Sequence, residues 1–468
     1  MAQLARTLRL RDLVLLNVAA IIGLRWLSVA AAGGPTSVTL WLLAMGLFFV
    51  PQACAVIDLT RLMPEEGGVY VWTRTAFGEV HGFVAGWCYW TNNLVYFPSL
   101  LVYVAGVSVF VAGSGHQALG EQPGYVVTFS LLALVTVAAA NVFGLRSGKW
   151  IHNVGGVGTW VTGGALVALG AVAALRLGLA TPLDPEGFVS GIVSLDKLSF
   201  WAGICFAFAG LELASVLAGE VEDAERTIPR AVVTSGVAIA CIYVLGTLAL
   251  LVALPAEEIS VVSGILQAIA AVSERLGVAW LTAPLALLVT LGGLGGLMAW
   301  FTGAARMAFV AGIDRFLPAG FGKLHPRWGT PYVAVIVQAA VAVAFVLMSF
   351  VGATVEEAYL VLLDTCVLVY FVPYVYLFAA YLRLRRRQPS APPAFPRRRS
   401  IGVFLGSAGL ATTVLAMTMA AVPPAGTANA TAHVAKTLGG FLGFLLAGAA
   451  VYLYETRRAS GGADPGGA

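Results

Sequence analysis

The sequence predicts an all-α polytopic membrane protein with twelve transmembrane helices. Its 468 residues are 59% hydrophobic and only 11% charged, and its mean hydropathy is +0.88, which is far too apolar for a soluble domain. A transmembrane helix needs about 20 mostly apolar residues. Segments of that kind, separated by turn signals, lie at residues 12–32, 37–60, 80–111, 124–143, 150–175, 198–218, 231–253, 280–311, 332–351, 357–382, 401–422 and 435–455.

The distribution of basic residues predicts the orientation. Twelve spans place both termini on one side of the membrane, and most of the 27 Lys and Arg residues fall on that side, including the run from Arg383 to Arg399. The connections on the opposite side hold few of them, namely Arg176, Lys197, Arg275 and Lys436. Because cytoplasmic loops carry the excess of Lys and Arg, we expect a multi-pass protein of the inner (cytoplasmic or plasma) membrane with both termini in the cytoplasm.

The sequence predicts four segments and no soluble domain. Residues 1–382 hold the first ten spans, and residues 383–400 form a basic cytoplasmic linker. Residues 401–456 hold the last two spans, and residues 457–468 form a Gly- and Ala-rich tail that we expect to be disordered. The linker is expected to anchor the topology, with binding of anionic lipid head groups as the alternative.

The motifs of enzymes and metal sites are missing from the sequence. No Walker lysine loop, nucleophile elbow or metal-ligand spacing occurs, and the five Cys residues lie inside apolar segments without a CxxC pair. We therefore expect neither an enzyme nor a bound cofactor or metal. The net charge of +4 does not imply binding of nucleic acid.

Arg25 places a full positive charge in the middle of the first apolar segment. A charge at the centre of a bilayer costs about 2.5–3.5 kcal/mol on insertion scales, so it normally faces a polar cavity or a partner. Arg25 therefore marks a candidate site. The interrupted apolar stretch, with another span following at once, also argues against a cleaved signal peptide.

Two spans are weakened at matching places in the chain. Span 1 carries Gly23-Leu24-Arg25-Trp26, and span 6 carries Phe208-Ala209-Gly210-Leu211-Glu212 at its middle. A glycine beside a charged residue in two segments five spans apart favours broken helices in an inverted five-plus-five repeat, with the repeats at about residues 12–175 and 198–382. Broken helices leave backbone N–H and C=O groups free to bind a carboxylate or an amine. The alternative is that these glycines only permit close helix packing.

Four motifs, one of which includes the weakened part of span 6, lie at the ends of spans or within them. They are Pro64-Glu65-Glu66-Gly67-Gly68-Val69-Tyr70-Val71-Trp72; Phe208 to Glu212 with Gly219-Glu220 and Thr227-Ile228-Pro229-Arg230-Ala231; Ala305-Arg306 through Asp314-Arg315-Phe316-Leu317-Pro318; and His325-Pro326-Arg327-Trp328-Gly329-Thr330-Pro331. In this order they resemble the motifs of the amino acid–polyamine–organocation superfamily of permeases. The Gly-Leu-Arg of span 1, the Pro-Glu-Glu-Gly-Gly and the aromatic-rich span 3 resemble the glutamate/GABA antiporter branch most, followed by plant-type polyamine transporters.

The resemblance implies the leucine-transporter fold, with alternating access around a midplane site between spans 1, 3, 6, 8 and 10. The unwound part of span 1 would be Gly23 to Trp26, whose amides receive a substrate carboxylate. The unwound part of span 6 would be Ala209 to Leu211, whose carbonyls receive the amino group. Aromatic side chains expected at the site are also compatible with core packing. The candidate substrate-binding residues are Gly23, Leu24, Arg25, Trp26, Tyr89, Phe206, Ala209, Gly210 and Trp300.

Three acidic residues lie in or close to the spans. Glu212 matches a family glutamate with a role in proton coupling and gating, since a buried carboxyl group can load and release a proton; a static hydrogen-bond acceptor is the alternative. Asp58 suggests a structural salt bridge with Arg61 or a nearby loop rather than a role in transport. Asp364, a further candidate coupling or gating residue, matches no family motif. It has three open roles: binding a substrate amine, pairing with Arg25, or lying in the vestibule.

The proton is favoured over sodium as the driving ion. Many sodium-independent relatives carry a lysine midway along span 5, whereas Thr159 lies at about that position here, and its hydroxyl is a potential sodium ligand. Thr159 is therefore a candidate coupling residue. Arg25, however, already supplies a fixed cation in the broken region and would repel a second one. We expect proton-coupled transport or exchange, with sodium symport as the alternative.

The sequence thus predicts a secondary active transporter of amino acids. A fixed guanidinium attracts a second carboxylate and repels an additional amine, which favours acidic or zwitterionic amino acids. Polyamines or cationic amino acids are the alternative substrates. An amino acid sensor on a permease scaffold and a channel are alternatives of other classes, and both a monomer and a homodimer remain open.

Overall fold

The computed structural model describes residues 9–63, 68–143, 148–212, 221, 223–313, 317–387, 398–423, 427 and 429–461. The long helices are α6 (Glu79–Ser108), α8 (Pro123–Phe143), α9 (Gly148–Arg176), α12 (Ala224–Ala253), α14 (Thr282–Ile313), α15 (Tyr332–Ser349), α16 (Val355–Arg387), α17 (Arg399–Ala420) and α18 (Ala430–Gly461). The shorter ones are α1 (Leu10–Ile21), α2 (Arg25–Ala32), α3 (Thr36–Ala44), α4 (Val50–Leu62), α5 (Gly68–Phe77), α7 (Gln117–Gly120), α10 (Leu195–Ala207) and α13 (Gly264–Arg275).

The all-helical membrane fold is confirmed. Within the described residues, nine helices are long and apolar enough to cross a membrane. One of them, Thr36–Leu62, joins α3 and α4 through a π-helical turn at Met45–Phe49. Two shorter apolar helices, Trp160–Arg176 and Lys197–Ala207, lie where spans 5 and 6 are predicted. The place of the first predicted span is taken by α1 and α2, and the count of twelve spans stays a prediction.

Both predicted interruptions are present as gaps between helices. The first helix ends at Ile21 and α2 begins at Arg25, while α10 ends at Ala207 and residues 208–212 are not helical. The unwound part of span 1 is shorter than the predicted Gly23–Trp26. Arg25 and Trp26 already belong to the first turn of α2, because the Trp26 N–H donates to the carbonyl of Gly23 (3.1 Å) and restarts the helix.

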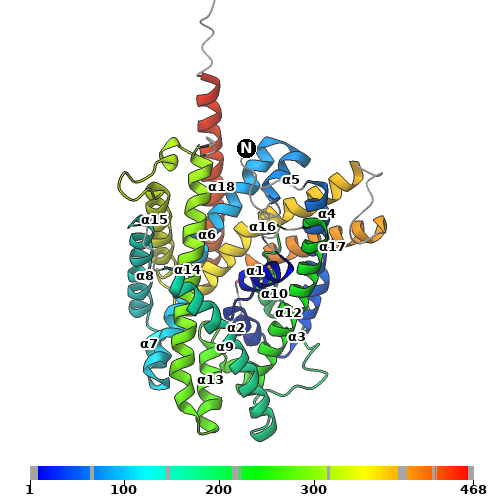
Figure 1. Cartoon of the computed structure of the whole chain (residues 1–468). Coiled ribbons are helices and arrows are strands. Elements are labelled where there is room, and N and C mark those ends of the chain that lie inside the picture. Colours follow the sequence, from blue (N-terminus) through cyan, green and yellow to red (C-terminus); the bar gives the residue numbers. More distant parts are fainter. Residues whose placement is uncertain are drawn as a thin grey trace, which may run out of the picture.

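The short helices mark the two ends of the bundle (Figure 1). The α5 helix and the C-terminal end of α18 lie at one end, and α7 and α13 lie at the opposite end. The helix α13 is hydrogen-bonded to α2: the N–H of Ile265 donates to the hydroxyl of Ser28 (3.1 Å). The last helix continues to Gly461, and the Arg-Arg-Ala sequence that follows Thr456 has high helix propensity. Disorder of the tail stays a prediction.

The centre of the bundle is built by close helix packing. The long helix α14 packs against α9 and α6, and α16 packs against α6. Gly293 permits one of these contacts, because a Cβ atom at this position would lie only 2.3 Å from Cγ2 of Val104. The breaks of the first and sixth predicted spans lie among these helices, as the contacts below show.

Candidate binding site at the two helix breaks

A cavity of about 680 Å³ lies beside the two breaks. It is lined from α1, α2, α6, α9, α10, α12, α14 and α16. All nine residues that the sequence predicts for substrate binding line it: Gly23, Leu24, Arg25, Trp26, Tyr89, Phe206, Ala209, Gly210 and Trp300. The structure therefore brings together residues from four segments that are far apart in the chain.

Arg25 enters this cavity from the first turn of α2 and is only 3% exposed. Its Nη1 donates to the hydroxyl of Ser99 (3.0 Å). The guanidinium lies over the rings of Trp26 and Tyr96, with its carbon 4.2 and 4.6 Å from their centroids, which is within the range of cation–π attraction. Trp300 from α14 packs beside Tyr96, with the ring centroids 6.2 Å apart.

The charge of Arg25 is not neutralised within the described part of the chain. The ion pairs found there involve other residues, and Nη2 of Arg25 is buried without a hydrogen-bond partner. No other charged side chain lines the cavity among the described residues. A buried cation that lacks an anionic partner is costly, so this site has the electrostatics of a receptor for an anion.

Two neutral polar groups on α6 also lack partners at this cavity. The hydroxyl of Tyr103 and Oδ1 of Asn92 are buried without a hydrogen-bond partner among the described residues, and both side chains line the cavity. Tyr103 lies within electrostatic range of Arg25. Since buried polar groups are normally paired, these atoms, like Nη2 of Arg25, point to a polar ligand.

Tyr243 of α12 joins the two breaks through its hydroxyl group. The hydroxyl oxygen lies 2.7 Å from the carbonyl oxygen of Ile21 and 3.0 Å from that of Ala207, the last helical residues of α1 and α10. The same oxygen accepts the N–H of Gly23 (3.3 Å). These contacts satisfy backbone groups that a helix end leaves free, and they tie the first break to the second.

Glu212 lies just after the second break and is 1% exposed. Its carboxylate accepts hydrogen bonds from the hydroxyls of Tyr374 (2.5 Å), Tyr370 (2.7 Å) and Tyr89 (3.4 Å) and from the amide of Gln52 (3.1 Å). Four donors from three helices thus surround one acidic group. Of these residues, Tyr89 and Tyr370 also line the cavity, whereas Glu212 does not.

The Glu212 cluster is connected to the backbone of the break. The hydroxyl of Tyr374 donates to Glu212 and accepts the N–H of Gly210 (2.7 Å). Gly210 has φ +126°, a conformation that favours glycine, and a Cβ atom there would lie 3.1 Å from the side chain of Ile21. A change at the carboxylate can therefore reach the unwound segment through a single hydroxyl group.

Aromatic rings form a continuous wall between the breaks and this cluster. Successive ring centroids are 5.2 Å apart between Trp26 and Phe206, 5.3 Å between Phe206 and Tyr370, and 5.6 Å between Tyr370 and Tyr89. These separations are typical of favourable aromatic pairs. The wall accounts for the aromatic residues predicted in spans 3 and 6.

Four residues that hold the site were not predicted from the sequence: Tyr243, Tyr370, Tyr374 and Gln52. A signal was present for part of this group. Tyr370 and Tyr374 stand one helical turn apart in an apolar span, and Gln52 is a polar amide inside another, so each polar group needed a partner within the bundle. No local pattern distinguished Tyr243 from a core tyrosine.

Asp58 and Asp364 do not line the cavity. Asp58 does form a structural ion pair, but the partner in the structure is Arg385 of α16 (2.8 Å) rather than Arg61 or a nearby loop, because α16 packs against α4. Asp364 is paired with His433 of α18 (3.0 Å) and not with Arg25. The side chain of Thr159 lies outside the described residues.

The sequence matches a family model described as amino acid permease over residues 8–444. This range contains both helix breaks, every residue that lines the cavity, and the Glu212 cluster. The match therefore concerns the whole site and not a single motif.

Three relatives illustrate the similarity. An uncharacterised transporter of Legionella pneumophila is 28% identical over 422 residues, which are 90% of each chain. A probable agmatine/putrescine antiporter of Lactococcus lactis is 24% identical over 80% of this chain and 78% of its own length. The glutamate/gamma-aminobutyrate antiporter of the same species is 22% identical over 83% of this chain and 78% of its own length.

Proposed function

Since this chain belongs to the amino acid permease family and its relatives are transporters, we propose that it carries amino acids across the cytoplasmic membrane by alternating access, with acidic and zwitterionic amino acids favoured. Transport is driven by protons or by exchange. The topology that goes with this proposal has twelve spans, the leucine-transporter repeat and both termini in the cytoplasm.

The observation that carries the proposal is the unpaired charge of Arg25 at the cavity. At 4 Å and an effective dielectric constant near 20, a unit charge pair interacts by about 4 kcal/mol. A side-chain carboxylate at Nη2 gains this attraction, and the amine of a polyamine meets an equal repulsion. No acidic side chain among the described residues lines the cavity to offset the repulsion.

The two breaks supply the remaining contacts of an amino acid. The first turn of α2 presents backbone N–H groups, and the dipole of a helix favours a carboxylate at this end. The carbonyls of Ala209 to Leu211 in the second break, as predicted, and the unpartnered Oδ1 of Asn92 are the acceptors for the amino group. An α-carboxylate, an amino group and a second carboxylate then each have a separate partner.

Coupling to protons is assigned to Glu212. An ionised carboxylate only accepts hydrogen bonds, whereas a protonated one also donates. Proton uptake by Glu212 therefore forces at least one of its surrounding donors to turn away. Tyr374 is the donor through which this rearrangement reaches Gly210, so loading of the proton alters the break that contacts the substrate.

Polyamines and cationic amino acids are the second candidate substrates. Their support is the similarity to a relative whose name includes agmatine and putrescine. A substrate sensor and sodium symport are further alternatives, and a homodimer is compatible with every one of them.

Counterflow with the purified protein in proteoliposomes tests the proposal. Vesicles loaded with glutamate should accumulate labelled glutamate, and external glutamate or aspartate should compete better than neutral amino acids, with arginine and putrescine weakest. Stronger competition by putrescine or arginine would refute the electrostatic assignment. A sensor would show binding without counterflow, and a sodium symporter would need a sodium gradient to concentrate substrate.

A further inference from the structure

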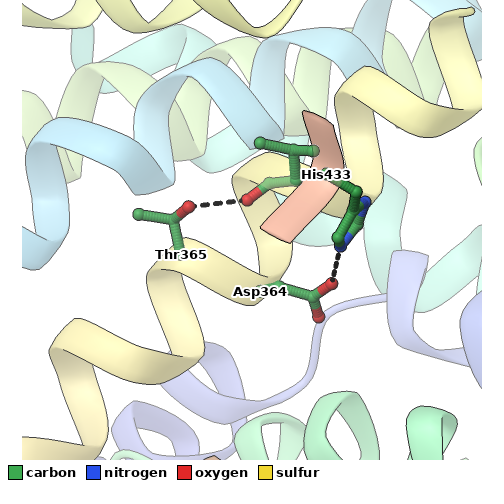
Figure 2. Close-up of polar contacts among 4 residues, drawn as sticks. Asp364, Thr365 and His433 are labelled. Carbon is green, nitrogen blue, oxygen red and sulfur yellow. Dashed lines mark hydrogen bonds and ion pairs between the residues drawn. The ribbon is translucent and has the colours of Figure 1, made fainter. Parts of the chain in front are cut away.

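Asp364 and His433 form a buried pair between two helices of different parts of the chain. Figure 2 shows the carboxylate of Asp364, on α16, directed at the imidazole of His433 in the first turn of α18, with Nε2 and Oδ2 3.0 Å apart. Asp364 is 5% exposed and His433 is 3% exposed. The described residues of α18 contribute nothing to the lining of the large cavity, whereas α16 contributes Tyr370.

Packing alone does not explain this pair. Replacing a buried ion pair by well-packed apolar residues is often neutral or stabilising, and ionisable groups inside a membrane protein are usually functional. Nδ1 of His433 is in addition buried without a partner among the described residues. Half of the hydrogen-bonding capacity of the ring is thus unused.

His433 also borders a second, very small cavity. Its volume is about 10 Å³, and its lining includes Glu357 and Lys436. Glu357 lies in the first turn of α16, and Lys436 lies in the second turn of α18. A space of this size is about what one water molecule needs. The second cavity is therefore a place where a water molecule can reach the imidazole from the end of the bundle opposite to the C-terminal end of α18.

The two ring nitrogens have different tasks in this geometry. When Nε2 carries the proton and donates to Asp364, Nδ1 is a free acceptor. A proton taken from water at Nδ1 leaves the Nε2 contact intact and turns it into an imidazolium–carboxylate pair. The hydrogen bond to the ionised carboxylate is charge-assisted already, and the added proton contributes the attraction between imidazolium and carboxylate, so it holds α16 more firmly against α18.

We propose that Asp364 and His433 bind one regulatory proton from the side of the membrane on which the second cavity lies, and that this proton slows transport by fastening α16 to α18. Asp364 is six residues from Tyr370, about 9 Å along the same helix. Tyr370 and Tyr374 contact Glu212. A helix held by α18 cannot shift its tyrosines freely between two arrangements of the site.

The titratable groups around the pair and the second cavity have contacts of their own. Lys436 donates to the carbonyls of Ser349 and Val351, and the carboxylate of Glu357 accepts the N–H of Thr354. Of the other titratable groups on α16 and α6, Glu356 interacts electrostatically with Glu357 and Glu121, and Tyr359 and Tyr103 interact with Arg25. Asp364 acts electrostatically on Cys366, and its hydrogen bond goes to His433.

Glutamate exchange in right-side-out and inverted membrane vesicles tests the proposal, with the full-length chain. Between about pH 8 and 5, where histidine changes its charge, acid on the side of the second cavity should slow wild-type exchange by about fivefold, the lower end of typical coupling between sites. Acid on the other side should not have this effect. H433Q and D364N should keep the alkaline rate and lose the dependence, whereas the control H116Q should retain it.

A readout without transport keeps the test independent of the substrate. The midpoint of thermal unfolding of wild-type protein should exceed that of H433Q by more at pH 6 than at pH 8. A difference that is the same at both pH values, or an H433Q pH profile identical to that of the wild type, would overturn the proposal and leave a purely structural pair. Loss of glutamate exchange with the pH-dependent unfolding difference intact would refute the proposed substrate and support the proton site.

Discussion

The hydroxyl oxygen of Tyr243 lies 2.7 Å from the carbonyl oxygen of Ile21, although the two residues are 222 positions apart in the chain. The ring is held in place by Trp41, which stacks on it with a centroid distance of 4.4 Å. The same hydroxyl contacts Ala207 at the end of α10. One side chain therefore fixes the relative position of both breaks.

Y243F should destabilise the protein, because it leaves buried backbone groups of both breaks without a partner. The expected loss is about 1–3 kcal/mol, seen as a lower midpoint of thermal unfolding in detergent. The control is Y125F, which removes a hydroxyl that pairs with Ser108 away from the breaks. Equal losses of stability in Y243F and Y125F would show that the contacts of Tyr243 with the two breaks stabilise the protein no more than an ordinary hydroxyl contact.

E212Q should uncouple transport from the pH gradient and spare exchange. The amide retains hydrogen-bonding groups for the tyrosines around it, but it cannot load and release a proton. Accumulation of substrate driven by an imposed pH gradient is the measurement, with counterflow in the same vesicles as the control for folding. If E212Q still concentrates substrate on a proton gradient, Glu212 is not the coupling residue.

Y374F should impair coupled transport more than Y89F. Tyr374 contacts Glu212 at 2.5 Å and also accepts the N–H of Gly210, whereas Tyr89 contacts Glu212 at 3.4 Å. Initial rates of uptake at a fixed pH gradient compare the two variants. A larger defect in Y89F would show that the contact of Glu212 with Tyr89, which lines the cavity, matters more for coupled transport than its contact with Tyr374.

R25A should lower the affinity for an acidic amino acid more than for a neutral one. The guanidinium acts on the second carboxylate, which the neutral substrate lacks, and the interaction is worth about 4 kcal/mol at most under the conditions given above. Competition curves for glutamate and glutamine in counterflow give the ratio directly. R25K is the companion variant, since it keeps the charge but not the planar donor group. Equal losses of affinity for glutamate and glutamine would mean that Arg25 supports the fold and does not set selectivity.

W300A should weaken substrate binding without unfolding the protein. The ring lines the cavity and packs on Tyr96, and an aromatic ring offers a large contact area. The half-saturation concentration in counterflow should rise, while W280A, which removes a ring that is 71% exposed, should leave it unchanged. Unaltered half-saturation in W300A would place this ring outside the substrate contacts.

The sequence by itself determined the class of the protein and the position of the breaks. Twelve apolar segments are a local property that hydropathy detects, and helices are the means by which single segments satisfy their backbone in lipid. A glycine next to a charge is also local, and Gly23-Leu24-Arg25 and Gly210-Leu211-Glu212 do mark the two interruptions. The family motifs then grouped nine residues that the structure places around one cavity.

Only the tertiary structure decided which polar groups are partners. Asp58 pairs with Arg385, not with Arg61, and Asp364 pairs with a histidine in the last helix. Inside a bundle, a polar side chain bonds to whichever group the packing of other helices brings within about 3 Å, and nothing in the neighbouring sequence records that group. For the same reason the roles of Tyr243 and Tyr374 could not be predicted from the sequence. Their contacts with the breaks depend on how α12 and α16 lie against α1 and α10.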